Sequence, residues 1–487
     1  MGTSYSLEDP RRRWSVLAVC CLSLLIVSLD VSIVNVALPS IRRDFTATVS
    51  GLQWTVDAYT LVMAALLMLS GSLGDRFGRR RVFQLGLVLF TLGSLMCSLA
   101  PSLGWLVVFR MVQAAGGSML NPVAMSIIVN TFTDPKERAR AIGFWGAVVG
   151  VSLALGPVVG GILVTSAGWR SIFWINLPIG IVAIILAQRF VPESRAARAR
   201  RFDPAAQILV AVFLGSMTYA IIAAPHQGVS SPLIVALAVL GLAAGTALVG
   251  VELRRREPLL DPRFFRSAPF SGATIAATAS FAALGGFLFV NALYLQDARG
   301  FSPLHAGIFT LPMAAMTAVF APISGRLVAG WGARVPLVSA GAAITLGAVL
   351  LIWLTPHTPA GLLLTSYALV GLGFGMVNAP VSNTAVTGMP RAQAGVATAI
   401  ASTSRQVGSA LGVAVTGSLV ATTTDTATTF TTASHPAWLV ITILGLIIVV
   451  VGFVSTSRWA TGTTERVRDL LMDHKEDISD TAVAQPA

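Results

Sequence analysis

The sequence predicts an all-α membrane protein in which 14 transmembrane helices form two six-helix bundles and an inserted two-helix hairpin. Hydrophobic residues make up 55% of the 487 residues and charged residues only 11%, whereas soluble domains carry roughly 25% charged residues. The charges lie in short runs between apolar stretches of about 20 residues, the length of a helix that crosses a bilayer. A soluble globular fold is therefore excluded.

The predicted spans follow one another along the whole chain. Hydropathy places their starts near Trp14, Gln53, Val82, Gly104, Ala139, Phe173, Ala205, Pro232, Phe270, His305, Pro336, Gly361, Val396 and Trp438. Three arginines precede the first span, which is too long for the core of a signal peptide and has no small-residue cleavage site. We expect this segment to stay in the protein as its first span.

The basic residues predict the orientation. Of the 33 Lys and Arg residues, 27 fall on the side of the N-terminus, four fall in the opposite loops and two lie within spans. Because basic loops resist translocation, both termini are expected in the cytoplasm of a multi-pass protein of the cytoplasmic (inner) membrane. The formal net charge of +12 therefore reflects topology and contact with the lipid bilayer, and no nucleic-acid partner is expected.

The chain also repeats itself. Five residues after the second span match five residues after the tenth at a fixed offset: Gly71, Leu73, Phe77, Gly78 and Arg80 match Gly325, Leu327, Trp331, Gly332 and Arg334. This offset pairs spans 1 to 6 with spans 9 to 14 and leaves spans 7 and 8 as an insertion. Parallel six-helix repeats are typical of alternating-access transporters.

The predicted organisation has five parts. They are a cytoplasmic N-terminus (1–13), an N-terminal six-helix bundle (14–190), an inserted hairpin with basic flanking loops (191–269), a C-terminal six-helix bundle (270–456) and a cytoplasmic tail (457–487) with little order.

Few ionisable side chains fall inside the spans, where each costs roughly 2.5 to 3.5 kcal/mol at the membrane centre. Asp30, Asp57 and Arg110 lie at similar depth near the outer side, so they are placed to touch, and Gln113 shares a helix face with Arg110 one turn deeper. We interpret these four residues as a functional cluster. A purely structural ion pair is the alternative, and for Asp57 a solvated carboxylate near the boundary.

The second repeat lacks this charged layer, since its alignment puts Tyr367 near the position of Arg110. Arg405 in span 13 is the exception, and no acidic residue lies at its depth. We expect it to bond to backbone carbonyls or to Gln406, Ser402 and Ser404 rather than to carry protons, because arginine does not deprotonate.

Several stretches resemble motifs of the fourteen-helix drug:proton antiporters of the major facilitator superfamily, over essentially the whole chain. They are LDVSIVNVALP (29–39), GSLGDRFGRRR (71–81), RMVQAAGG (110–117), Gly150 with GPVVGG (156–161), WR (169–170), INLPIG (175–180) and RQVG (405–408). The fifth-span stretch is similar to the motif of antiporters rather than importers, and Ala114 stands where glycine is usual.

The resemblance implies the major facilitator fold and export of drugs driven by protons, with no cofactor. It implies that Asp30 exchanges the proton, that Arg110 stabilises its charged form and that Gln113 fixes both side chains by hydrogen bonding. No phosphate-binding loop for ATP is present in the sequence. The three cysteines and five histidines lack metal-ligand spacing, so no metal site is expected.

Two motifs supply gating candidates. In the loop motif, the glycines are expected to allow tight turns and close helix approach, and Asp75 to pair with neighbouring arginines or a helix N-terminus, whereas simple anchoring of topology is the alternative for the arginines. In span 5, small residues every four positions predict a close helix contact, with general packing as the alternative. The gating candidates are Gly71, Asp75, Arg76, Gly78, Arg79, Gly156, Pro157, Gly160 and Gly161.

A drug site is expected to be a mostly apolar cleft with aromatic walls. The candidates for it are Asn35, Trp54, Tyr59, Phe281, Phe287, Asn291 and Arg405, although lipid contact or packing is the alternative for each aromatic residue. Spans 9 to 14 contain no acidic residue at depth. This argues against dications and favours monocationic or neutral amphipathic compounds such as antibiotics and dyes.

The sequence therefore predicts a monomeric secondary transporter and no enzyme activity. Two alternatives stay open: a nutrient importer or facilitator of the same fold, and a membrane sensor that transports nothing. The fifth-span motif argues against the importer. The sensor predicts that neutralising Asp30 leaves every phenotype intact.

Overall fold

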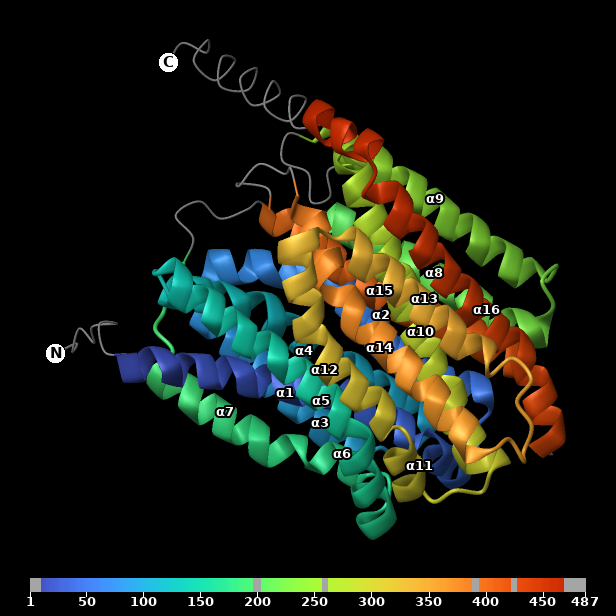
Figure 1. Ribbon diagram of the computed structural model, residues 1–487. Coiled ribbons are helices and arrows are strands. Elements are labelled where there is room, and N and C mark those ends of the chain that lie inside the picture. Colours follow the sequence, from blue (N-terminus) through green and yellow to red (C-terminus); the bar gives the residue numbers. More distant parts are fainter. Residues whose placement is uncertain (1–9, 196–202, 256–261, 388–393, 422–426, 468–487) are drawn as a thin grey trace, which may run out of the picture.

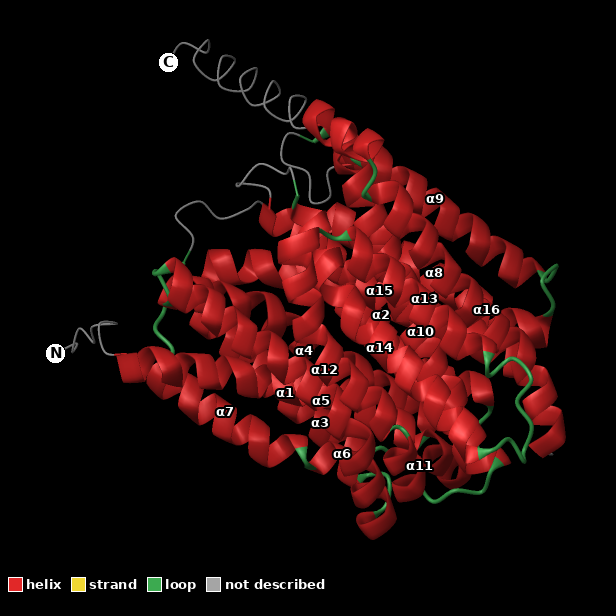
Figure 2. Ribbon diagram, in the orientation of Figure 1, coloured by secondary structure: helices red, strands yellow, loops and turns green. Residues whose placement is uncertain are grey.

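The computed structural model describes residues 10–195, 203–255, 262–387, 394–421 and 427–467. Within these ranges the chain is helical and contains no strand (Figure 2). Most of the helices are long and run side by side (Figure 1). The all-α prediction is confirmed.

The N-terminal half consists of seven helical elements: α1 (Pro10–Phe45), α2 (Val49–Phe77), α3 (Arg79–Ser98), α4 (Leu103–Thr131), α5 (Pro135–Ala167), α6 (Ser171–Trp174) and α7 (Asn176–Phe190). The hairpin consists of α8 (Pro204–Gln227) and α9 (Pro232–Arg254). The C-terminal half consists of η1 (Pro262–Arg266), α10 (Ala268–Leu293), η2 (Tyr294–Ala298), α11 (Pro303–Phe309), α12 (Leu311–Trp331), α13 (Arg334–Val349), α14 (Ala360–Val386), α15 (Ala394–Val420) and α16 (Ala427–Ser455).

The helix starts follow the hydropathy pattern closely. Each of the first 13 predicted spans begins within about one turn of a helix start, whereas α16 begins at Ala427, well before the predicted Trp438. Among the described residues, 11 helices are long and apolar enough to cross a membrane, with α6–α7, α10–η2 and α11–α12 each counted as one. The remaining predicted spans correspond to α5, α13 and α15, so the total of 14 crossings stays a prediction.

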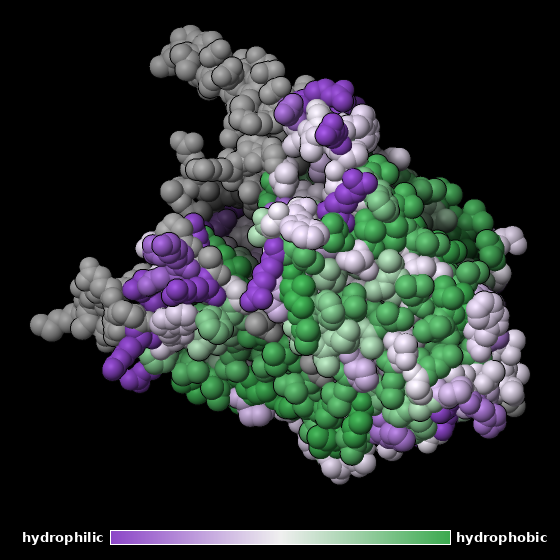
Figure 3. Space-filling view, viewed as in Figure 1, coloured by the Kyte–Doolittle hydropathy of each residue, from purple (hydrophilic) through white to green (hydrophobic). Residues whose placement is uncertain are grey.

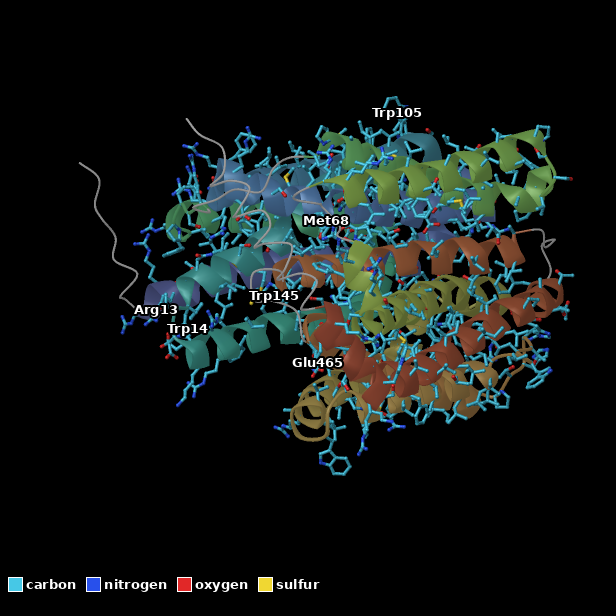
Figure 4. The ribbon with its side chains drawn as sticks, turned by 90° about the horizontal axis from the view of Figure 1, so that it is seen from above. Arg13, Trp14, Met68, Trp105, Trp145 and Glu465 are labelled. Atoms are coloured by element: carbon cyan, nitrogen blue, oxygen red, sulfur yellow. The ribbon has the colours of Figure 1, made fainter. Side chains whose placement is uncertain are left out.

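The outer surface of the helices is suited to lipid. Large apolar side chains such as Leu85, Leu242 and Val450 are exposed, and Figure 3 shows a broad hydrophobic face between hydrophilic side chains at the two ends of the helices. Exposed apolar surface of this extent is stable only in contact with lipid or a partner. The start and the end of the described chain, marked by Arg13 and Glu465, lie toward the same end of the helices (Figure 4), as an even number of crossings requires.

The two halves pack through a few helices. Within the N-terminal half the closest partners are α3 with α4, α2 with α4 and α1 with α5, and within the C-terminal half α10 with α15, α12 with α14 and α13 with α16. Between the halves, α2 lies against α15, and α5 lies against α11 and α12. These contacts form the interface that a rocking motion of the halves would change.

The hairpin lies against both halves mainly through α8. Helix α8 contacts α2 and α15, whereas α9 contacts α8 and η1. The Trp54 ring of α2 lies 5.6 Å from the Tyr219 ring of α8, the Gln207 amide donates to the Ala65 carbonyl, and His226 lies within hydrogen-bonding distance of the Ser50 hydroxyl, at 3.0 Å.

The repeat is visible in the backbone. Gly78 between α2 and α3 has a φ of +109°, and Gly332 between α12 and α13 has a φ of +79°. Positive φ is easily adopted only by glycine. The matched glycines therefore turn the chain at equivalent points of the two repeats.

The expected disorder of the tail is wrong for its first part. Residues 458–467 are helical, Thr463 accepts a hydrogen bond from the backbone N–H of Ala268 at 2.9 Å, and Val467 is buried with Phe264 and Phe270. Apolar side chains among the polar residues of this segment give it a surface to pack. The rest of the tail lies outside the described residues.

Candidate functional site

A buried polar cluster lies at the centre of the N-terminal half, around the carboxylate of Asp30 on α1. Nη1 of Arg110 on α4 lies 2.5 Å from Oδ2 of Asp30, and Nε2 of Gln113 donates to Oδ1 at 2.8 Å. Asp30 and Arg110 are each only 1% exposed. A buried ion pair costs desolvation energy unless further hydrogen bonds satisfy both groups, and here several such bonds are present.

Arg110 uses both its hydrogen-bonding fork and its flat face. Nη1 also donates to Oε1 of Gln113 at 2.8 Å, and Nε donates to the backbone carbonyl of Thr55 on α2 at 3.3 Å. The guanidinium carbon lies 4.1 Å from the centroid of the Tyr59 ring. This combination of forked donation and stacking is specific to arginine, and it ties α1, α2 and α4 together.

Two further residues complete the cluster, and neither was predicted as a site residue. Nδ2 of Asn176 on α7 donates to Oδ1 of Asp30 at 3.1 Å and to Oγ of Ser94 on α3 at 3.0 Å. Ser94 in turn donates to the backbone carbonyl of Phe173 at 3.0 Å. Asn176 belongs to the INLPIG stretch, and this was the only signal in the sequence that could have identified it.

The local fold explains how these side chains meet. The helical path from α6 to α7 is interrupted at Ile175, so that Asn176 stands at the start of α7. Gly93 on α3 and Gly116 on α4 let these helices approach closely, because a Cβ on Gly93 would lie 2.6 Å from the Gln113 backbone and one on Gly116 2.3 Å from the Phe90 nitrogen. This approach brings Ser94 within reach of the cluster.

Asp57 does not join the cluster. Its side chain on α2 is fully buried, and neither carboxylate oxygen has a hydrogen-bond partner among the described residues. The expectation that Asp30, Asp57 and Arg110 touch is therefore fulfilled by two of the three. Asp57 is also not the solvated carboxylate that its sequence position left open. All three residues lie at similar depth along their helices. Asp57 is two positions before Tyr59, the α2 residue that stacks on Arg110, so the side chain of Asp57 leaves α2 in a different direction.

The predicted cavity residues occupy several different environments. Tyr59 stacks on Arg110, and Trp54 contacts the hairpin. Asn35 is buried, and its amide donates to the carbonyl of Val31 in its own helix at 2.9 Å. Tyr59 and Asn35 therefore make these contacts within the N-terminal half, whereas Trp54 packs with the hairpin and against a buried cluster that includes Ala410 of α15.

In the C-terminal half, Phe287 packs edge-on against Tyr367 and Trp438, with ring centroids 5.5 and 5.8 Å apart. The Tyr367 hydroxyl donates to Oδ1 of Asn291 at 2.5 Å, so Tyr367, near the position of Arg110 in the repeat, has a neutral partner instead of a carboxylate. Phe287 and Asn291 thus belong to the core of this bundle. Phe281 is half-buried and packs against Phe374, 5.6 Å away.

A small apolar pocket lies between the two halves. Its lining comes from α1, α5, α10, α12 and α14: Ser32, Pro157, Leu284, Leu288, Met313, Ala314, Thr317 and Phe374. A site between the repeats, enclosed by apolar side chains with few polar groups, is the expected position for a substrate of this architecture. Of the residues singled out in the sequence, Pro157 lines it, and Phe281 adjoins it through Phe374.

The loop motif differs in part from expectation. Asp75 pairs with Arg79 at 2.9 Å, but the N-terminus of α3 is capped by Glu193, whose Oε1 accepts from the backbone N–H of Arg80 at 3.2 Å. Arg76 is exposed. Gly71 lies inside α2, and a Cβ there would meet Cβ of Pro122 on α4 at an ordinary contact distance of 3.9 Å. The prediction that Gly71 is needed for a turn or a close approach is therefore wrong, whereas Gly78 does turn the chain.

The fifth-span motif contacts a helix on each side. A Cβ on Gly156 would lie 1.8 Å from Oγ of Ser32, and Gly160 faces Ile33, also on α1. Gly161 faces the backbone of Leu304 on α11, and the Pro157 carbonyl lies where a Cβ on Gly307 would be. Helix α5 therefore lies between its own bundle and the other half. The contacts at Gly156, Gly161 and Gly307 depend on the absence of a side chain, whereas a Cβ on Gly160 would make an ordinary contact with Ile33 at 3.4 Å.

Polar contacts also join the two halves at the ends predicted to face outside. Nε2 of Gln53 donates to the carbonyls of Val413 and Ala414 on α15 at 3.2 and 2.8 Å, and Gln296 donates to the carbonyl of Val36 at 2.8 Å. Arg42 lies 3.4 Å from Asp297. The halves are thus closed against each other at this end.

Two repeated helical bundles, an apolar pocket between them and a buried charge network within one of them define a secondary transporter of the alternating-access type. A sequence profile of the Major Facilitator Superfamily matches residues 20–413. The chain belongs to this family, as its motifs predicted.

Relatives and solved structures agree with this assignment. The chain is 39% identical to multidrug resistance protein Stp of Mycobacterium tuberculosis over 402 residues, covering 82% of this chain and 74% of that protein. It is 33% identical to multidrug efflux pump LfrA of Mycolicibacterium smegmatis, covering 86% and 83%. The crystal structure of a bacterial homologue of the human lysosomal transporter Spinster superposes with a TM-score of 0.67 at 19% identity, covering 94% and 99%, and it shows the common fold.

Proposed function

We propose that this protein exports amphipathic antibiotics and dyes across the cytoplasmic membrane in exchange for protons. The observation that carries the proposal is the Asp30 carboxylate, which is buried in the membrane-spanning part and held by Arg110, Gln113 and Asn176. An intramembrane carboxylate in a transporter is a functional group by default. The names of Stp and LfrA, a multidrug resistance protein and a multidrug efflux pump, support the export of drugs.

The proton is taken up and released at Asp30. When Asp30 is charged, Arg110 neutralises it, and when it is protonated, Arg110 loses its counter-charge and the hydrogen bonds rearrange. In the described conformation Asp30 is closed to water, being 1% exposed, so proton exchange occurs in another conformation of the cycle. Each pH unit supplies about 1.4 kcal/mol per proton, and each 100 mV about 2.3 kcal/mol per charge.

Asp57 is a second proton-exchanging group in this proposal. It is buried without a hydrogen-bond partner among the described residues, and a bare carboxylate in such a place is costly. Its carboxyl group therefore carries a proton in the described conformation. A charged Asp57 requires water or a new partner, which only a rearrangement of α2 supplies.

Rocking of the halves is controlled at two places. The loop motif, with Gly71, Asp75, Arg76, Gly78 and Arg79, links α2 to α3 on the cytoplasmic side. The glycines and proline of α5 (Gly156, Pro157, Gly160 and Gly161) hold the outer side closed, because α5 contacts both α1 and α11. The contacts of Gln53 and Gln296 break when this side opens.

The substrate is bound between the halves. The pocket lined by Leu284, Leu288 and Phe374 is almost entirely apolar, which suits monocationic or neutral amphipathic molecules. The protein works as a monomer with both termini in the cytoplasm.

Proteoliposomes test the proposal. Ethidium transport under an imposed pH gradient is compared in wild type, Asp30→Asn, Asp57→Asn and Arg110→Ala. We expect gradient-driven transport in the wild type and none in Asp30→Asn, with both proteins folded by size-exclusion chromatography. If Asp30→Asn concentrates ethidium as well as wild type does, the proton assignment is wrong.

Transport measurements also separate the two alternative functions. A nutrient importer or facilitator would show uptake of a nutrient in cells and no accumulation of dyes in inverted vesicles. A non-transporting sensor would show no dye flux in any variant.

A further inference from the structure

Arg405 on α15 is a cation that has no carboxylate partner within the described part of the chain. Its Nη2 donates to the Ser382 hydroxyl on α14 at 2.7 Å, and its Nη1 lies 3.5 Å from the Ser402 hydroxyl. Its Nε is buried, and none of the described residues offers it an acceptor. Arginine has five donors, and two hydroxyl contacts leave most of them unused.

Acidic groups are scarce throughout this half. Between residues 268 and 455, Asp297 is the one carboxylate among the described residues. It lies at the far end of the α10–η2 path and pairs with Arg42. The charge of Arg405 is therefore not balanced within its own bundle, in contrast to Arg110, and an unpaired cation in the membrane-spanning part is costly.

Arg405 adjoins the pocket between the halves. Its guanidinium carbon lies 6.0 Å from the Phe281 ring, and the Phe281 ring packs against Phe374, which lines the pocket. Phe281 lies one turn before Leu284, another lining residue, on the same face of α10. The cation thus lies on the side of the pocket nearer the start of α10.

The surroundings of Arg405 are polar and open. Ser382 and its neighbour Asn383 are exposed, although α14 packs against α10, α12, α13 and α15. Exposed hydroxyl and amide groups on a membrane helix indicate contact with water rather than with lipid tails. A cation that lies between exposed polar groups and an apolar pocket suits a molecule with an acidic group and an apolar body.

We propose that Arg405 binds the acidic group of the substrate, a carboxylate or an ionised hydroxyl, while the apolar body of the substrate occupies the pocket beyond Phe281. Ser382 supplies a second donor to the same group. The inference rests on the proposed export function and deepens it: among amphipathic substrates, those with an acidic group are expected to bind more tightly than plain cations, which meet a like charge here. The bond formed is a charge-assisted hydrogen bond from guanidinium to oxyanion.

Two dyes that differ in one group test the proposal. Rhodamine B is a zwitterion with a free carboxylate, and its ethyl ester is a cation with the same ring system. Their binding to the purified full chain in detergent is measured by fluorescence anisotropy without a pH gradient. We expect the wild type to bind the acid about tenfold more tightly than the ester.

Three variants test whether Arg405 causes the preference for the acid over the ester. Arg405→Gln is expected to bind both dyes equally, Arg405→Lys to keep part of the preference, and Arg299→Gln to keep all of it. Arg299 is a matched control because it donates to the Thr358 carbonyl at 2.5 Å, near the opposite end of α10. Wild type without a preference for the acid overturns the proposal whether or not the variants fold, and so does a preference that survives in Arg405→Gln.

The binding assay is independent of the proton assignment. If the preference for the acid is present but no gradient-driven transport occurs in proteoliposomes, the proposed export function fails while the role of Arg405 stands. If transport occurs and the wild type binds both dyes equally, the role of Arg405 fails alone.

Discussion

Asn176 on α7 and Asp30 on α1 are joined by a hydrogen bond of 3.1 Å from Nδ2 to Oδ1. The same oxygen accepts from Gln113 at 2.8 Å, so two amides hold one side of the carboxylate while Arg110 holds the other. The orientation of Asp30 therefore depends on α7 as well as on α4.

Asn176→Ala is expected to lower gradient-driven transport by about tenfold or more without unfolding the protein, because a hydrogen bond to a charged group contributes about 1.5 to 3 kcal/mol. The pH dependence of transport is expected to shift, because Asp30 loses one donor to its charged form. Transport rates in proteoliposomes across a series of pH values measure both effects. Asn130→Ala on α4 is the control, since Asn130 is exposed and bonds within its own helix. A variant with the wild-type rate and pH profile contradicts a positioning role for Asn176.

Arg110→Lys is expected to abolish transport almost as completely as Arg110→Ala. An ammonium group cannot bond to Asp30, Gln113 and the Thr55 carbonyl together, nor stack as a plane on Tyr59. Removing one partner of a buried ion pair costs about 3 to 5 kcal/mol, so Arg110→Ala is expected to have a lower melting temperature as well. Arg189→Lys, at an exposed position on α7, is the control for replacing an arginine by a lysine outside the cluster. Efficient transport by Arg110→Lys would show that charge alone suffices.

Asp57→Asn is expected to be as stable as the wild type or more stable, because the change removes a carboxylate whose oxygens have no partner among the described residues. It is expected to lower the number of protons exchanged per substrate. Simultaneous recording of dye flux and internal pH in proteoliposomes measures this ratio. A ratio equal to that of the wild type removes Asp57 from the proposed proton path.

Gly156→Ala is expected to destabilise the contact of α5 with α1 by about 1 to 3 kcal/mol, since the new methyl group overlaps Oγ of Ser32. The melting temperature in detergent is expected to fall, and a second change, Ser32→Gly, to restore part of it. Gly143→Ala on the same helix is the control, because no atom lies within 4 Å of the position of its Cβ. Equal melting temperatures for Gly156→Ala and Gly143→Ala would mean that α1 moves aside at no cost.

Much of the site was predictable because depth in a membrane follows from position along a helix. Asp30 and Arg110 lie on helices that run side by side, and their similar distance from the outer ends was sufficient to place them together. Gln113 followed from the helical repeat. The direction of a side chain around its helix axis depends on tertiary packing, and for that reason Asp57 could not be excluded from the cluster in advance.

The residues that sequence reasoning missed depend on breaks and close contacts. Asn176 reaches Asp30 because the helical path is interrupted at Ile175. Pro178 accounts for the break, since it has no N–H to donate to the carbonyl of Trp174, but a proline in the sequence does not tell which neighbour Asn176 then meets. Glu193 caps α3 from a segment more than a hundred residues away. Phe287 and Asn291 lie in the core of their bundle rather than at a cavity, because a helix with small residues on several sides can be enclosed completely. Hydropathy does not indicate which face of such a helix would line a cavity.

The α8 helix covers the line along which α2 meets α15. The corresponding line between α5 and α12 has no such cover among the described helices, so the two flanks of this transporter present different barriers to molecules dissolved in the lipid. The inserted pair of helices therefore shields one of the two seams between the bundles from lipid and leaves the other seam to α5 and α12 themselves.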